Sequence, residues 1–112
     1  MDSILNSIKK LLGIEKDYEV FDADIIMHIN TVFVILAQMG VGPNKPFMIL
    51  DNSATWADFW GDKESNDAVI TYMYMKVRML FDPPSSGTAT NATEEMIKEL
   101  EWRLNFQAEL KE

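Results

Sequence analysis

The chain has 112 residues, of which 47% are hydrophobic and 25% are charged, and its formal net charge at pH 7 is −8. This length and composition fit one globular domain and exclude a chain that is disordered throughout. The absence of cysteine excludes disulfides, thiol catalysis and thiolate metal sites.

Charge and hydropathy narrow the possible partners. The basic residues are scattered, with Lys9 and Lys10 the only adjacent pair, which argues against a surface that grips nucleic-acid phosphates. The longest apolar run, 32–37, is far shorter than the roughly 20 residues that a membrane span needs. The N-terminal segment is amphipathic and lacks the apolar core of a signal peptide, so we expect no membrane association and no export.

The first predicted helix lies near the N-terminus, where Asp2 or Ser3 can cap its start and Gly13 can end it. A second helix is predicted from Asp22, as its N-cap, to Gly40, which can supply a left-handed residue at the end. Its apolar arc is wide, which is typical of a helix that is buried centrally or touches another subunit. The buried stripe of this helix is expected to contain Ile25, Ile29, Val32 and Leu36.

The middle of the chain is predicted to be a loop, because 41–52 contains two prolines that cannot donate a hydrogen bond to a helix or a central strand. A short extended piece at 47–50 is an option within it. A single helical turn is predicted for 55–60, closed by Gly61. The next long helix should begin at Ser65 or Asn66 and end at Phe81.

The segment from Pro83 to Asn91 has the Pro, Ser, Thr and Gly content of a mobile loop, above all from Ser85 to Asn91. Asn91 and Glu94 have the spacing of a capping box, so the last helix is predicted from about Ala92 to Leu110. The predicted fold is therefore all-α. A single domain, 1–112, would hold a small bundle of four main helices and one short helical turn.

No residue pattern predicts catalysis, a cofactor or a metal. The segment 40–45 lacks the strand context and the hydroxyl residue of a phosphate-binding loop. His28 lies one helical turn from Asp24, but no nucleophile accompanies them, and a polar position on the helix explains the histidine better. The segment 51–56 begins like a calcium loop but has Trp56 where the sharp turn needs glycine. The glutamates of the last helix are expected on a solvated face: Glu94, Glu95, Glu99, Glu101 and Glu109.

Surplus apolar residues predict interaction with a partner. The last helix carries a second stripe, Trp102, Phe106 and Leu110, beyond the one that packs on a core. This stripe either wraps into the same core or forms an exposed anchor for a partner. In the short helical turn, Trp56, Phe59 and Trp60 can likewise either pack into the core or form an exposed anchor for a partner.

Four segments of the chain resemble the small head-tail connector, or adaptor, proteins of tailed bacteriophages and prophages: 77–86, 96–105, 24–30 and 38–43. The resemblance implies a structural, non-enzymatic protein without cofactors, whose copies form a ring beneath the portal and prolong the DNA channel. It further implies that the C-terminal helix reaches the portal protein and that a stopper or tail-completion protein docks on the opposite side. Assembly would occur in the host cytoplasm, and the finished protein would lie in the virion neck.

The resemblance leaves open the copy number, with a dodecamer as one option, and whether free subunits are monomers. On this interpretation the acidic charge lets DNA pass through the channel without specific binding. The charge alone also permits a different function, that of an acidic DNA mimic or another helical interaction protein that blocks a DNA-binding partner. Such a mimic needs a dense acidic array on one outer face, and basic residues interrupt the last two helices.

Overall fold

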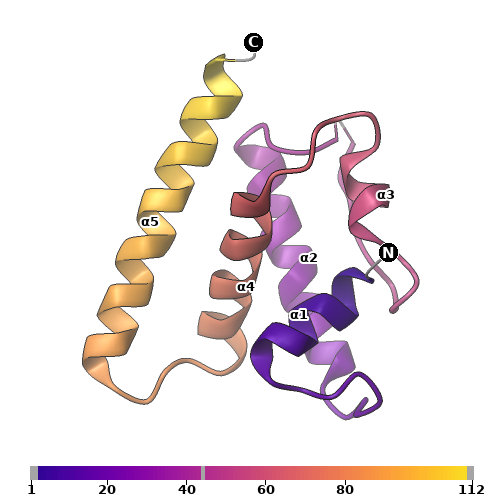
Figure 1. The fold of residues 1–112 in the computed structure, drawn as a ribbon, viewed down its shortest axis with the longest axis vertical. Coiled ribbons are helices and arrows are strands. Elements are labelled where there is room, and N and C mark those ends of the chain that lie inside the picture. The colour runs from indigo at the N-terminus through magenta and orange to yellow at the C-terminus, as the bar shows by residue number, and fades with distance from the viewer. Residues whose placement is uncertain (1–2, 44, 111–112) are drawn as a thin grey trace.

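The computed structural model describes residues 3–43 and 45–110. Its helices are α1 (Ile4–Leu12), α2 (Asp22–Gln38), α3 (Trp56–Trp60), α4 (Asp67–Phe81) and α5 (Gly87–Leu110). The described residues form no strand beyond one isolated bridge between Ser3 and Thr55. The prediction of an all-α fold with four main helices and a short one is confirmed (Figure 1).

The core lies between α1, α2 and α4, which pack against one another (Figure 1). α2 buries the stripe that its apolar spacing predicts, while Leu11 at the end of α1 and Leu80 at the end of α4 are exposed. The buried side chains of the whole chain form one cluster, and its central members are Ile4, Ile8, Ile25, Ile29, Val32, Leu36, Val69, Met73 and Val77. α3 and α5 are added to this three-helix centre from different sides.

Capping explains where the shorter elements begin and end. Ser3 caps α1 by accepting a hydrogen bond from the Asn6 N–H at 3.2 Å, and Gly13 ends the helix as predicted. Asp2, the other candidate cap, lies outside the described residues. Thr55 and Asp58 form a reciprocal capping box on α3, which stabilises a helix of only five residues.

Lys9 has no solvent exposure although the sequence places it among polar residues of α1. Its ammonium donates to the carbonyls of Lys16 and Tyr18 at 3.0 and 2.8 Å, and lies 2.8 Å from the carboxylate of Asp22. The prediction that Asp22 caps α2 is therefore wrong: Phe21 occupies the cap position, and Asp22 in the first turn pairs with Lys9 instead. These contacts fix the connection between α1 and α2.

In the segment after α2, a side chain of α2 forms the backbone hydrogen bonds that a neighbouring strand would otherwise form. The Asn30 amide accepts from the Ile49 N–H at 2.8 Å and donates to the Ile49 carbonyl at 2.9 Å. Both backbone groups of a buried residue are thus satisfied by one side chain, as buried polar groups require. The optional extended piece at 47–50 is not a strand, but it is held against α2.

The last helix begins earlier than predicted, because Gly87 to Asn91 are helical and only 82–86 connect α4 to α5. Ser86, and not Asn91, supplies the cap: its hydroxyl accepts from the Ala89 N–H at 3.0 Å. Thr90 and Thr93 then donate their hydroxyl hydrogens to carbonyls one turn earlier. Serine and threonine, counted as loop residues in the sequence, here support a helix.

Candidate interaction surface

α5 is the longest helix, and it lies along one edge of the molecule with α4 as its main neighbour (Figure 1). Its inner side is sparsely apolar. Only Ile97 and Leu104 are buried, and Leu100 is half-buried. Beyond these residues most of the helix surface is free of contact with the rest of the chain.

A polar contact adds to this attachment. The Tyr72 hydroxyl, on a fully buried side chain of α4, donates to the Glu101 carboxylate at 2.7 Å. Burial and the neighbouring Glu101 carboxylate raise the pKa of Tyr72 well above its ordinary value. Lys76 lies 4.0 Å from the same carboxylate. The prediction that Glu101 belongs to a solvated face is therefore wrong, because it turns inward to bind Tyr72.

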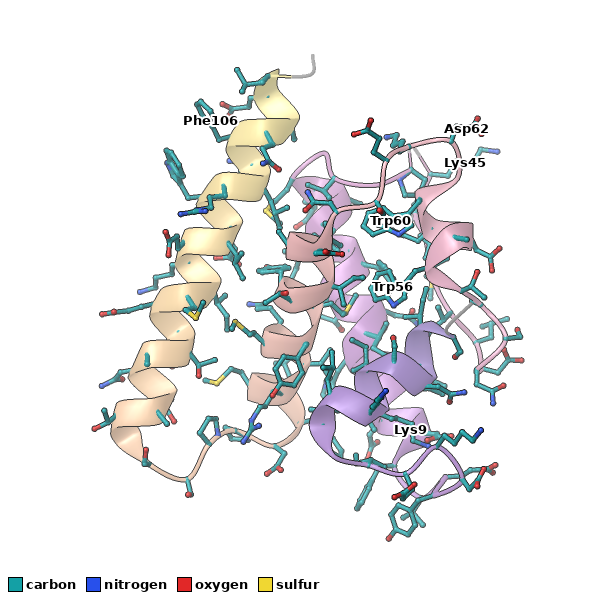
Figure 2. All side chains as sticks on the ribbon, in the orientation of Figure 1. Lys9, Lys45, Trp56, Trp60, Asp62 and Phe106 are labelled. Atoms are coloured by element: carbon teal, nitrogen blue, oxygen red, sulfur yellow. The ribbon has the colours of Figure 1, made fainter. Side chains whose placement is uncertain are left out.

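The outer α5 stripe consists of Trp102, Phe106 and Leu110, which are exposed by 66%, 47% and 70%. The Trp102 and Phe106 rings stack on each other with centroids 5.3 Å apart and planes 9° from parallel. Figure 2 shows Phe106 pointing away from the bundle. The sequence allowed this stripe either to pack into the core or to be exposed, and in the structure it is exposed.

The aromatic residues of α3 pack into the core instead of forming an exposed anchor. Trp56 and Phe59 are buried, and Trp60 is half-buried with its ring stacked near that of Trp56. The Trp56 indole N–H donates to the Ser7 hydroxyl at 2.9 Å, which ties α3 to α1. Phe33 packs at the centre of this group. Trp56 and Phe59 are therefore core residues, and they have the buried position of the two that the sequence allowed, not that of exposed anchors.

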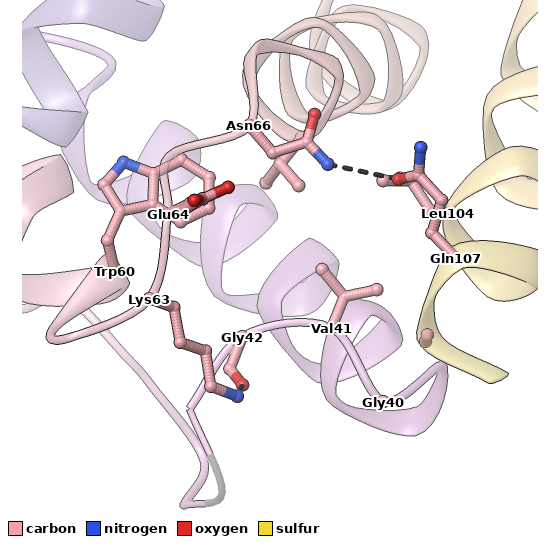
Figure 3. Close-up of a pocket in the computed structure, with 11 residues that line it drawn as sticks. Gly40, Val41, Gly42, Trp60, Lys63, Glu64, Asn66, Leu104 and Gln107 are labelled. Atoms are coloured by element: carbon pink, nitrogen blue, oxygen red, sulfur yellow. Dashed lines mark hydrogen bonds between the residues drawn. The ribbon is translucent and has the colours of Figure 1, made fainter. Parts of the chain in front are cut away.

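An open hollow of about 710 Å³ lies between the C-terminal half of α5 and the loops that surround α3 (Figure 3). Across it, Asn66 donates to Gln107 at 3.4 Å, and Lys63 donates to the Gly42 carbonyl. Gly42 has a φ of +100°, and a Cβ there would lie 2.6 Å from the Phe59 ring. The glycine of this segment is thus required by a turn and by close packing, and not by a phosphate.

The remaining candidates from the sequence are dispersed. The His28 ring is half-buried with its centroid 6.5 Å from that of Phe81, while Asp24 is exposed. Asp51 accepts hydrogen bonds from the Ser53 hydroxyl and N–H, which lower the pKa of its carboxyl. Residues 3–43 and 45–110 contain no group of three side chains placed to hold a metal ion.

Charges of both signs alternate on α5. Arg103 lies 2.8 Å from the Glu99 carboxylate, and Lys98 is exposed nearby. The continuous acidic face that a DNA mimic needs is therefore not formed on the exposed side of this helix. Acidic and basic groups instead surround the outer α5 stripe.

Exposed, stacked aromatic rings such as those on α5 are typical of surfaces that bind another protein. Comparison with known families defines the protein further. The family described as phage connector protein matches residues 4–111, so the chain belongs to this family, which is a structural one. The role is thereby that of a connector in the head-tail neck of a phage.

Searches of the curated proteins and of the solved structures gave no match. No helix in the described part of the chain combines the length and the apolar character that crossing a bilayer requires.

Proposed function

We propose that this protein is a connector subunit whose copies form a ring below the portal and extend the DNA channel. The observation that carries the proposal is the outer α5 stripe, two exposed aromatic residues and an exposed leucine on a chain of the phage connector family. In this arrangement Trp102, Phe106 and Leu110 contact the portal protein. A stopper or tail-completion protein binds at the other end of the ring, and the assembled subunit resides in the virion neck.

The energetics of the stripe support a role as an anchor. Aromatic residues dominate the energy of many protein interfaces, and each buries roughly 150–250 Å² when fully covered. Trp102 and Phe106 are already stacked in the free protein, so little side-chain freedom is lost on binding. Covering their exposed parts would supply about 2–4 kcal/mol each at about 25 cal/mol per Å².

The charge of the chain supports passage of DNA. A net charge of −8 on each copy creates a negative potential around the ring, which repels phosphate and disfavours adhesion of the genome. The proposal requires neither a cofactor nor a metal. Assembly takes place in the host cytoplasm, before the tail joins the head.

The portal contact is tested by co-sedimentation of the purified protein with DNA-filled tailless heads of the phage that encodes it. We expect the wild type to bind and the Trp102→Ala/Phe106→Ala variant to lose at least tenfold in affinity, because two interface anchors are removed. Tyr18→Ala is the matched control, since it removes a half-exposed aromatic residue from the connection between α1 and α2. Equal binding of all three proteins would remove the stripe from the portal contact.

A further inference from the structure

Two further exposed apolar patches lie on opposite faces of the bundle. α1 and α2 pack against each other through their buried stripes, so their exposed sides point in opposite directions. Figure 1 shows α2 passing behind α1 and α4, and the molecule is thinnest, at 19 Å, along this direction. Each patch can therefore contact a different neighbouring molecule.

The first patch, the α2 ridge, is apolar with an acidic end. Met27 and Val34 are at least half exposed on the outer side of α2. The segment held by Asn30, which lies between them in the sequence of α2, exposes Met48 and Leu50 by 60% and 87%. Asp24 continues the exposed side of α2 toward its N-terminus.

The second patch, the α1 hollow, is concave. It has a volume of about 970 Å³ and lies between α1, the start of α3 and α4. Its apolar lining includes Leu11, Ile14 and Ile70, and its charged lining residues are Lys10, Glu15 and Lys16. This face therefore carries a small positive excess on a chain whose net charge is −8.

We infer that the α2 ridge of one copy docks into the α1 hollow of the next copy. Both patches carry exposed apolar residues, and Asp24 on the ridge has a sign opposite to that of Lys10 and Lys16, which line the hollow. Docking of two ridges would instead offer Asp24 no group of opposite charge among the residues that form the ridge. A second copy of this chain is thus the occupant that the charges favour.

The symmetry of this contact has a definite consequence. It joins different surfaces of identical chains, so repetition gives a closed ring or an open chain and never a closed dimer. The inference rests on the proposed function, which requires a ring, and it adds the faces through which neighbours meet. It leaves the outer α5 stripe free for the portal.

Disulfide trapping tests the contact, because the natural chain has no cysteine. Leu11→Cys is combined in turn with Met27→Cys, Val34→Cys or Leu50→Cys, the variants are bound to tailless heads, and the heads are oxidised. Since two cysteines bond only when their Cα atoms are within about 7 Å, we expect at least one pair to yield a ladder of cross-linked multimers. Leu11→Cys alone should yield no cross-linked dimer.

The outcomes separate the two proposals. Subunits that bind heads but give no ladder with any pair, or a dimer with Leu11→Cys alone, would overturn the ridge-and-hollow contact and keep the connector role. Subunits that fail to bind heads at all would contradict the proposed function itself.

Charge exchange gives a second test that does not depend on geometry. Lys10→Glu/Lys16→Glu and Asp24→Lys should each reduce ring formation on heads about tenfold or more, because like charges then face each other. An equimolar mixture of the two variants should restore it, since alternating copies place opposite charges at every contact. No loss in the single variants, or no recovery in the mixture, would contradict the inference.

Discussion

Lys9 shows how one residue can hold two helices in place. Its buried ammonium has three oxygen partners, and removal of the charge would leave the Asp22 carboxylate without its cation and two carbonyls without their donor. Loss of one partner of a buried ion pair costs about 3–5 kcal/mol, and the partial exposure of Asp22 reduces this figure here.

We therefore expect Lys9→Met to lower the free energy of unfolding by about 2–4 kcal/mol in urea titrations. The neighbouring exposed Lys10 gives the control, and Lys10→Met should change stability by less than about 0.5 kcal/mol. Equal effects of the two substitutions would show that the buried contacts of Lys9 do not stabilise the fold.

Tyr72 makes a pH-dependent contribution. Its raised pKa means that the folded chain holds the phenolic proton more tightly than the unfolded chain does. The stabilisation is therefore complete below about pH 10, the ordinary pKa of tyrosine, and is lost as the pH rises from there toward the folded-state pKa. Glu101 contributes by accepting the hydrogen bond of the protonated form.

Tyr72→Phe should cost about 1–2 kcal/mol at pH 7, since a hydrogen bond to a charged acceptor is removed. This difference from the wild type should shrink above pH 10, and unfolding curves at pH 7, 9 and 10.5 measure it. The Tyr74→Phe variant is the control: it retains Tyr72, so its free energy of unfolding should fall above pH 10 as that of the wild type does. A gap between wild type and Tyr72→Phe that is constant with pH would refute the role given to the Tyr72 proton.

Individual residues also show what the sequence can predict. Helix spacing and local caps predict α1, α3 and α4 well, because Ser3, Thr55 and Asn66 bind the backbone within three residues of themselves. The contacts of Asn30 and Tyr72 join residues 19 and 29 positions apart, and local pattern does not contain such pairings. For Lys9 a signal exists, since it lies one turn after Leu5 on the buried side of α1, yet its charge suggested solvent.

At the scale of elements, α5 differs from the other long helices by its weak attachment. Its start was predicted too late because Gly87, Thr88 and Thr90 have the composition of a loop, while Ser86 in fact caps a helix there. The spacing of the outer α5 stripe could be predicted from the sequence. The burial of Trp56 and Phe59 could not, because aromatic residues occur both in cores and in interfaces. Only the three-dimensional fold determines whether such residues lie in the core or in an interface.

The C-terminal half of α5 depends on Leu104, which is 2% exposed, and on Ala108 beside Gly40. We expect Leu104→Ala to cost about 2–3 kcal/mol, since buried leucine truncations cost at least this much. Hydrogen exchange should then accelerate in 101–110 more than in α2, because stability is not uniform across a structure.

Leu110→Ala is the control for this element. Its side chain is 70% exposed, and its truncation should leave exchange in α5 unchanged. A uniform acceleration of exchange across all helices in Leu104→Ala would show that α5 is not a separable element.

At the scale of the whole molecule, three surfaces have separate roles in the proposed assembly. The outer α5 stripe contacts the portal, while the α2 ridge and the α1 hollow join neighbouring copies. These surfaces lie on different sides of a flat bundle of 40 × 35 × 19 Å, so all three can be occupied at once. A ring subunit requires this separation, because each copy must meet two neighbours and a portal at the same time.

The central claim is that the protein forms a ring on the portal, and cryo-electron microscopy of tailless heads incubated with it tests this most directly. The account predicts a ring of helical density coaxial with the portal, with the C-terminal half of α5 at the portal surface. Trp102→Ala/Phe106→Ala heads should lack this ring. Density elsewhere on the head, or heads without added density at saturating wild-type protein, would contradict the account.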